Sequence, residues 1–218
     1  MTTLGLSADE VLTTTRAVRK RLDFGRPVAK KILRECLQIA LQGPSGSNAQ
    51  GWHFVLVDDR EIIIEIARYY ARAFEDYAAS DIQPMHHHQD DPDMADTQAR
   101  VLDSAKYLAD NLHRVPALLI PCSSTRPDFP GTNMSAIAGI CGSIIPAAWS
   151  FMLAARERGL GTCWTTLHLN FEQEVAELIG IPADHAQLAL IPIAHTIGTE
   201  FRPAPRKDLD SVLHVNRW

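Results

Sequence analysis

The stretch Gly43-Pro44-Ser45-Gly46-Ser47-Asn48-Ala49-Gln50-Gly51-Trp52 separates a helix pattern from a strand pattern. Before it, apolar residues recur with helical spacing over residues 29–42. After it, residues 53–58 form a short, mostly apolar run that predicts a strand. The loop is rich in small and carboxamide side chains, and a carboxamide both donates and accepts hydrogen bonds. The simplest interpretation is a helix-to-strand turn. The functional interpretation is a site for a polar, planar ligand.

A cluster of basic residues precedes this loop. Residues 16–34 hold more than a third of the 21 lysines and arginines of the chain, namely Arg16, Arg19, Lys20, Arg21, Arg26, Lys30, Lys31 and Arg34. Guanidinium groups bind phosphate oxygens in pairs, so the cluster predicts a phosphate site. The last three of these residues fit the solvated face of a helix. We expect no nucleic-acid partner, because the cluster lacks interleaved aromatic residues and the formal net charge is −5.

The composition predicts one globular α+β domain over residues 1–218. Hydrophobic residues make up 46% of the chain and charged residues 22%, which is ordinary for a soluble protein. Helix and strand patterns alternate without a repeat or a linker, which predicts a sheet with helices on both faces. The 4 cysteines form no CxxC pair, so we expect free thiols in a reducing compartment. The first residues lack a basic region followed by an apolar run, and we expect a cytoplasmic protein.

Residues 136–155 form a run of uncharged residues as long as a membrane-spanning helix. Much of the run is alanine, glycine and serine, and Pro146 is expected to interrupt the helix. We therefore predict a buried helix at the centre of a soluble protein, and no membrane partner.

Residues 80–96 contain two prolines, three consecutive histidines and several aspartates, and they predict an irregular loop. Imidazole and carboxylate groups are good metal ligands. No second cluster supplies the remaining ligands for His86–His88, so we expect no metal site. The sequence also shows no nucleophile with a base beside it.

Four segments in this order resemble the FMN-dependent nitroreductase superfamily: Arg16-Ala17-Val18-Arg19-Lys20-Arg21, Pro44 to Gln50, Gly159-Leu160-Gly161-Thr162-Cys163-Trp164-Thr165-Thr166, and Arg206-Lys207-Asp208-Leu209. The resemblance runs from about Thr13 to Trp218 and is weak across 69–114. It implies a nitroreductase-like three-layer α/β/α fold, with a mainly antiparallel mixed sheet flanked by helices. It also implies a homodimer with the flavin at the interface, in which the C-terminal tail reaches over the partner subunit.

The same resemblance implies that one FMN is held by Arg16, Ala17, Arg19, Pro44, Ser45, Asn48, Gln50, Thr165, Thr166, Leu167, Arg206 and Lys207. Ala17 replaces the serine that is usual in the family, so one hydrogen bond to the flavin is missing. The backbone N–H groups of 165–167 are expected to face the flavin N1/O2 edge, where fixed donors stabilise negative charge. The flavin N5 carries the chemistry, so no catalytic side chain is expected.

The implied activity is transfer of a hydride from NADH or NADPH, via flavin N5, to an electron-poor small molecule such as a nitroaromatic or a quinone, with ping-pong kinetics. Residues 69–114 are expected to form a variable substrate lid, with candidate lid residues Tyr69, Tyr70, Phe74 and Tyr77. One alternative is a reductive dehalogenase related to iodotyrosine deiodinase, because residues 165–170 are similar to its flavin loop, although residues 69–96 contain no lysine. Another alternative is a flavin-binding protein without turnover.

Overall fold

The computed structural model describes residues 3–88 and 90–218. Its helices are α1 (Ala8–Thr14), α2 (Lys30–Ala40), α3 (Arg60–Ala78), α4 (Pro92–Asn111), α5 (Met134–Glu157) and α6 (Glu172–Ile179). Its strands are β1 (Leu22–Asp23), β2 (Trp52–Val57), β3 (Ala117–Ser123), β4 (Leu160–Thr162), β5 (Ala186–Gln187) and β6 (Ile191–Thr196). Short 3₁₀ turns are η1 (Gly46–Asn48), η2 (Pro84–His86), η3 (Leu112–Arg114), η4 (Leu167–Phe171) and η5 (Leu209–Ser211).

The sheet is built around β3, in which every residue is buried. Its main path has the order β1-β6-β3-β2, while β4 pairs with β6 and β5 pairs with β3. All of these strand pairs are antiparallel, and β2 runs along β3 from the Trp52–Ser123 pair to the Val57–Leu118 pair. A strand that is buried on both faces needs cover from both sides.

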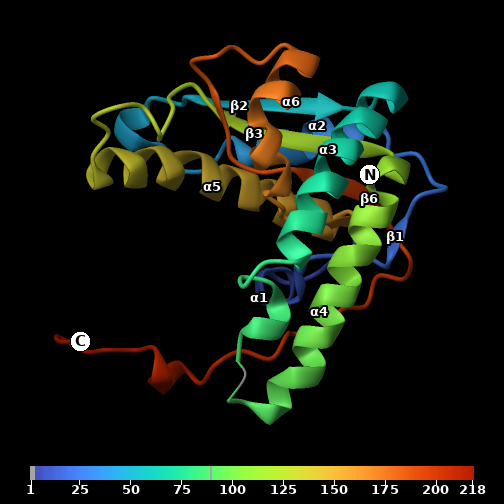
Figure 1. Ribbon diagram of the computed structural model, residues 1–218, viewed down its shortest axis with the longest axis vertical. Helices are drawn as coiled ribbons and strands as arrows, with labels where there is room; N and C mark the ends of the chain where they lie inside the picture. Colours follow the sequence, from blue (N-terminus) through green and yellow to red (C-terminus); the bar gives the residue numbers. More distant parts are fainter. Residues whose placement is uncertain (1–2, 89) are drawn as a thin grey trace.

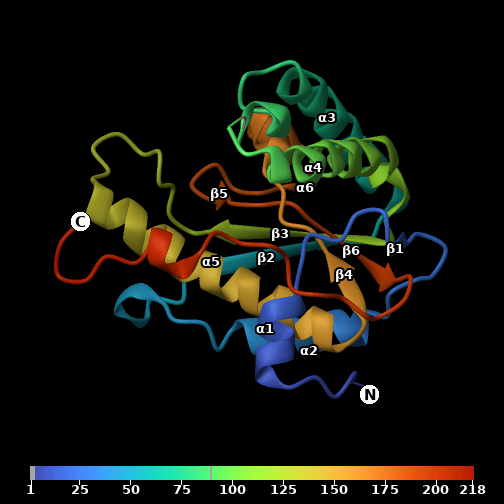
Figure 2. The ribbon, with the colours of Figure 1, turned by 90° about the horizontal axis from the view of Figure 1, so that it is seen from below.

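Helices supply that cover in two layers (Figure 2). Helices α3, α4 and α6 lie on one face of the sheet, and α1, α2 and α5 lie on the other (Figure 2). The first layer closes a core around Ile66, Leu108 and Leu118. The second layer closes a core around Leu33, Phe151 and Ile191. The structure confirms the predicted α+β class and the mainly antiparallel sheet between helices.

Two predictions about helix boundaries were wrong. Helix α5 continues through Pro146 instead of being interrupted there. Proline removes one backbone hydrogen bond, and the packing of the buried residues that follow it, such as Ala148 and Phe151, offsets that loss. Helix α4 begins at Pro92, inside the stretch predicted to be an irregular loop. A proline is well tolerated in the first turn, because the N–H that it lacks has no helical partner there.

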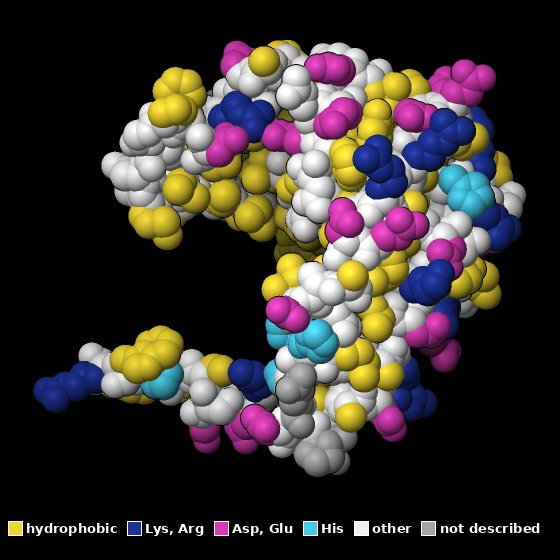
Figure 3. Space-filling model, viewed as in Figure 1, with side chains coloured by type: hydrophobic (Ala, Val, Ile, Leu, Met, Phe, Trp, Pro, Cys, Tyr) yellow, Lys and Arg dark blue, Asp and Glu magenta, His cyan; other side chains and the backbone are white. Residues whose placement is uncertain are grey.

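The N-terminal half of α5 projects beyond the sheet, and the C-terminal tail leaves the domain on the same side (Figure 1). Figure 3 shows a wide hollow between them, with apolar side chains along the face of α5 that borders it. Large exposed apolar side chains lie on both segments: Met134, Ile145 and Trp149 on α5, and Leu209, Val212, Leu213, Val215 and Trp218 on the tail. By length and composition alone α5 is apolar enough to cross a membrane, and 28% of its apolar window is buried.

The segment with the first basic residues packs directly on β4. Val18 donates its N–H to the Thr162 carbonyl at 2.8 Å, and Ala17 forms a parallel bridge with Thr162. Gly161 permits this close approach. A Cβ at that position would lie 2.9 Å from Val18 Cγ1 and 2.8 Å from Thr196 Cγ2, closer than side chains tolerate. The glycine therefore places the arginine segment against the sheet.

We expect Gly161→Ala to destabilise the fold by about 1–3 kcal/mol, because the added methyl group overpacks the contact with Val18. Urea unfolding followed by circular dichroism measures the change. Gly25→Ala is the matched control, since a Cβ there would meet Asp23 Oδ1 at an ordinary 3.5 Å. Equal stability of Gly161→Ala and wild type would show that the close approach is not needed.

Candidate functional site

A cavity of about 480 Å³ lies between the arginine segment, helix α4 and the start of the tail. Five of the side chains around it are cations, and we call it the basic pocket: Arg16, Arg19, Lys20, Arg21 and Arg100, together with Ser104, Phe201 and Pro205. Ala17 forms a bridge with Thr162, the last residue of β4. This bridge places the arginine segment against β4, which is followed in the sequence by residues 165–167. The basic pocket is thus lined by the first of the four segments that the sequence singled out, and the Ala17–Thr162 bridge connects that segment to the third.

The charges in the basic pocket are mostly uncompensated. Lys20 pairs with Asp103 across the pocket. Arg19 Nη1 donates to Ser104 Oγ at 3.3 Å, and Arg100 Nη2 donates to Thr97 Oγ1 at 3.0 Å. Arg16, Arg19, Arg21 and Arg100 form no salt bridge with any residue that the structure describes. Unpaired guanidinium groups that converge on one cavity are the donor set that a phosphate group requires.

Arg206 and Lys207 follow Pro205 on the exposed tail. The Arg206 guanidinium donates to the Pro205 carbonyl at 2.9 Å, next to the wall of the basic pocket. The tail therefore brings two further cations to the edge of this pocket.

The loop that contains Pro44, Ser45, Asn48 and Gln50 has a strained backbone. Ser47, Asn48 and Gln50 have positive φ values of 53°, 53° and 51°. Left-handed backbone in non-glycine residues costs free energy and gathers at functional sites. Hydrogen bonds within the loop include those from Gln50 N to Ser45 Oγ at 3.1 Å and from Gln50 Nε2 to Asn48 Oδ1 at 3.0 Å. Asn48 and Gln50 are exposed, so their side chains face outward from the chain.

Helix α5 keeps this loop away from the basic pocket. Gly46 N donates to Ser143 Oγ at 3.0 Å, which ties the loop to the N-terminal half of α5. Arg156 Nε donates to Thr14 Oγ1 at 3.2 Å, which ties the start of the arginine segment to the C-terminal end. The two anchor residues are 13 positions apart on one helix, or about 20 Å at about 1.5 Å per residue. Within one chain the predicted site residues therefore form two separate groups.

Thr165 is only partly available to a ligand. Its N–H and its hydroxyl group both donate to the Leu190 carbonyl, at 3.1 Å and 3.0 Å. This corrects the expectation that the Thr165 N–H faces a flavin edge, because the sheet already uses that donor. Thr166 is exposed and Leu167 opens the 3₁₀ turn η4, so the role of these two residues at a flavin stays a prediction.

His168, in the same turn, is a residue that the sequence analysis missed. It is fully buried, and neither ring nitrogen has a hydrogen-bond partner among the described residues. Burial lowers the pKa of His168 to about 3, so the ring is neutral at physiological pH. A single histidine inside the pattern Thr-Thr-Leu-His-Leu-Asn gave no reason to select it.

The lid candidates divide into core and surface residues. Tyr70 and Phe74 are buried in the core under α3, so we no longer expect them to contact an acceptor. Burial raises the pKa of the Tyr70 phenol, and its hydroxyl group contacts Thr165. Tyr69 is half-buried against the Phe171 ring at 5.4 Å, and Tyr77 is half-buried near Phe74. The stretch 69–114 comprises the end of α3, η2, α4 and η3, and its residue 89 lies outside the described residues.

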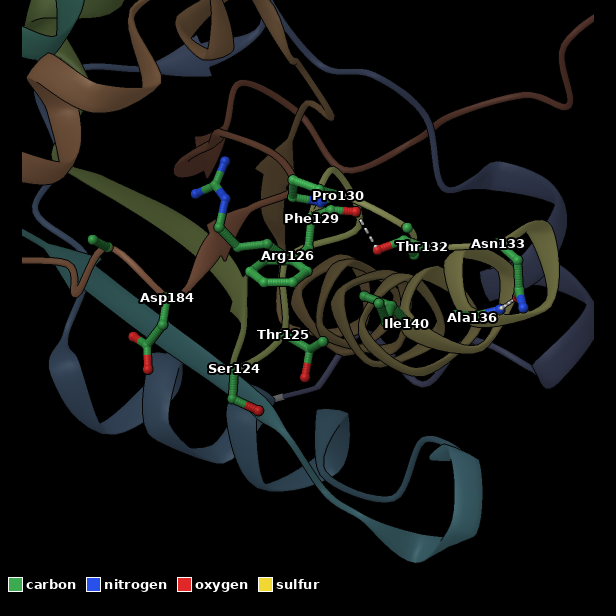
Figure 4. A pocket seen from close by; sticks show the side chains of 12 residues that line it. Ser124, Thr125, Arg126, Phe129, Pro130, Thr132, Asn133, Ala136, Ile140 and Asp184 are labelled. Atoms are coloured by element: carbon green, nitrogen blue, oxygen red, sulfur yellow. Dashed lines mark hydrogen bonds between the residues drawn. The ribbon is translucent and has the colours of Figure 1, made fainter.

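A second, larger cavity of about 640 Å³ lies at the N-terminal end of α5 (Figure 4). Arg126 lines it, and its donors are all engaged with Glu172, Asp128 and the His185 carbonyl at 2.7–3.1 Å. These bonds keep the pKa of the Arg126 guanidinium above its usual range. The cavity therefore offers a ligand little unpaired charge.

The metal-ligating and nucleophilic side chains among the described residues are dispersed or buried. Within residues 3–88 and 90–218, no group of three His, Cys, Asp or Glu side chains could hold a metal ion. The His86 and His87 rings contact the backbone carbonyls of Asp81 and Ile82. Burial raises the pKa of three thiols, Cys36, Cys122 and Cys163, which keeps them protonated.

Comparison with known proteins identifies the family of the chain. A candidate NADH dehydrogenase/NAD(P)H nitroreductase of Methanothermobacter thermautotrophicus is 24% identical over 212 residues, covering 96% of this chain and 86% of that protein. A 4-nitrobenzoate reductase of Nocardioides sp. is 24% identical over 193 residues, covering 80% and 74%. The structure of oxidized iodotyrosine deiodinase, bound to FMN and 3-iodo-L-tyrosine, has the same fold with a TM-score of 0.70, 20% identity and coverage of 96% and 99%. The model of the nitroreductase family matches residues 12–195, and the protein belongs to the nitroreductase family.

Proposed function

We propose that the protein is a homodimeric FMN-dependent oxidoreductase that uses NADH or NADPH to reduce an electron-poor acceptor, a nitroaromatic or a quinone. The observation that carries this proposal is the basic pocket, where arginines without carboxylate partners converge beside the family's sequence motifs. When bound, FMN supplies the two-electron chemistry that no side chain of this site can perform. The reductases among the relatives support the same reaction class.

The residues of the basic pocket fit the phosphate end of FMN. Arg16 and Arg19 would bind the phosphate, and Arg206 and Lys207 would approach it from the tail. A terminal phosphate carries more charge than the internal phosphates of a dinucleotide, and it suits a compact cluster of cations. Thr166 and Leu167 would orient the flavin ring at the opposite side, through their backbone N–H groups. Ala17 offers no hydroxyl group, so the remaining donors have to hold the cofactor.

We propose that a second copy completes the site. The strained loop with Ser45, Asn48 and Gln50 and the arginine segment are tied to α5 at Ser143 and Arg156, which are about 20 Å apart along the helix. The exposed side chains of the loop can serve the pocket of a partner subunit instead. The apolar face of α5 and the apolar tail give that partner a surface to cover. We also propose a cytoplasmic location, which the four free cysteines support.

Removing one unpaired arginine should weaken FMN binding. We expect Arg16→Ala to lose about 1.5–3 kcal/mol of binding free energy, or about 10- to 150-fold in Kd, because it removes a charge-assisted contact. Quenching of FMN fluorescence during titration of the apoprotein measures the affinity. Lys31→Ala, an exposed basic residue on α2, is the matched control and should bind FMN like wild type. Unchanged affinity in Arg16→Ala would remove the basic pocket from the phosphate assignment.

A charge on the exposed face of α5 should break the dimer. We expect Ile145→Arg, at a side chain that is 41% exposed, to yield a monomer that has lost FMN, since each pocket then lacks the partner's loop. Light scattering gives the mass, and the absorbance at the flavin band gives the cofactor content. Leu12→Arg, at an exposed position on α1, is the control that should remain a flavin-loaded dimer. A monomer with full flavin content would contradict the shared site.

The reaction itself is tested by rapid mixing of the purified protein with NADH or NADPH. We expect bleaching of the flavin band by at least one of them, and parallel lines in double-reciprocal plots with a nitroaromatic or quinone acceptor. These lines are the mark of ping-pong kinetics. Turnover of iodotyrosine alone would favour the dehalogenase. Flavin that neither pyridine nucleotide reduces would favour a binding protein without turnover.

A further inference from the structure

Two guanidinium groups stack on the ring of Phe201, at the start of the tail. The Arg21 Cζ lies 4.0 Å from the ring centroid, and the Arg156 Cζ lies 4.9 Å from it. Both distances are within the range of a cation–π attraction, which strengthens when water is excluded. Phe201 is half-buried and also lines the basic pocket. One aromatic ring thus connects the arginine segment, helix α5 and the tail.

Arg156 depends on this ring more than a surface arginine would. Its side chain is only 5% exposed, and burial lowers the pKa of its guanidinium. It forms no salt bridge with any described residue, and its hydrogen bond goes to the neutral Thr14 hydroxyl group at 3.2 Å. A buried charge without a directly paired carboxylate is costly unless other groups stabilise it. Glu157 and Glu10 act on Arg156 electrostatically without forming a salt bridge, and the negative face of the Phe201 ring adds a contact at 4.9 Å.

Arg21 holds the backbone that leads up to the same ring. Its Nε donates to the Ile197 carbonyl at 2.8 Å, and its Nη1 donates to the Glu200 carbonyl at 2.9 Å. The Ile197 N–H donates in return to the Arg21 carbonyl at 2.8 Å. Further along, Arg16 Nη1 donates to the Arg202 carbonyl at 3.1 Å. The arginine segment therefore fixes residues 197–202 in place.

We propose that Phe201 is a positioning residue, which clamps the tail between Arg21 and Arg156 and thereby sets the wall of the basic pocket. The clamp determines where Arg206 and Lys207 enter and in which direction residues 209–218 leave the domain. Phe201 acts on the cofactor through the tail, with no requirement that it touch the flavin itself. The effect on FMN rests on the proposed function of the basic pocket. The contacts of Phe201 with Arg21 and Arg156 lie within the chain and do not require FMN.

The experiment compares Phe201→Leu, which keeps the apolar bulk, with Phe201→Tyr, which keeps the aromatic face. Arg21→Lys is a second variant, since it keeps the charge but loses the planar group that stacks and bonds to two carbonyls. Phe129→Leu is the matched control, because the ring of Phe129 is 68% exposed and lies far from Phe201 in the sequence. Limited trypsin digestion with mass spectrometry follows cleavage after Arg206 and Lys207, on protein with and without FMN. Titration gives the Kd for FMN.

Phe201→Leu and Arg21→Lys should each raise the rate of tail cleavage and the Kd for FMN by about tenfold, the equivalent of about 1.4 kcal/mol. Phe201→Tyr and Phe129→Leu should stay within about twofold of wild type, since both keep the clamp. Wild-type cleavage rates in Phe201→Leu would overturn the proposal, and so would a tyrosine variant that is as sensitive as the leucine variant. If wild-type protein bound no FMN, the proposed function would fail, whereas cleavage of the tail in the apoprotein would still decide the clamp.

Discussion

The site is governed by one rigid element, helix α5. Its C-terminal half is buried against α2 and the sheet, and its N-terminal half extends past them. The arginine segment is tied to the buried end through Arg156, and the strained loop is tied to the projecting half through Ser143. Because α5 is one continuous helix with a fixed rise per residue, the two anchors stay about 20 Å apart within one chain. This separation of the two groups supports the proposal that a second copy of the chain unites them.

The exposed apolar surface leads to the same conclusion by a separate route. The tail ends in apolar side chains that have no core of their own, and Trp218 is fully exposed. Each square ångström of apolar surface removed from water contributes about 25 cal/mol, so a tail of this composition gains much from being covered. The projecting part of α5 offers a second uncovered apolar surface (Figure 3). Length and composition alone would also allow this helix to cross a membrane, but its C-terminal half is already part of the protein core.

Local sequence patterns predicted the helices and strands well, but they predicted less well which contacts these elements form in the folded protein. The helix predicted over residues 29–42 and the strand predicted over 53–58 follow from neighbouring residues, and the structure contains both, as α2 (Lys30–Ala40) and β2 (Trp52–Val57). The path of α5 through Pro146 depends on packing with distant residues, which a local rule about proline does not include. In the same way, the Thr165 N–H is used by Leu190, 25 positions later, and no motif reveals that bond. The burial of Tyr70 likewise depends on which face of α3 meets the sheet.

The strongest indication of function comes from arginines that the fold leaves unsatisfied. The larger cavity also contains an arginine, but Arg126 donates its hydrogen bonds to two carboxylates and a carbonyl. Such bonding is expected of an arginine that stabilises a loop. In the basic pocket, by contrast, Arg16 and Arg19 bond only to neutral groups among the described residues, namely the Arg202 carbonyl, the Ser104 hydroxyl and the Cys163 thiol, although like charges repel one another. Folding alone gains little from such an arrangement, because each guanidinium would be more stable beside a carboxylate. An anionic ligand removes the repulsion and supplies the missing acceptors, so the smaller cavity is the better candidate for the active site.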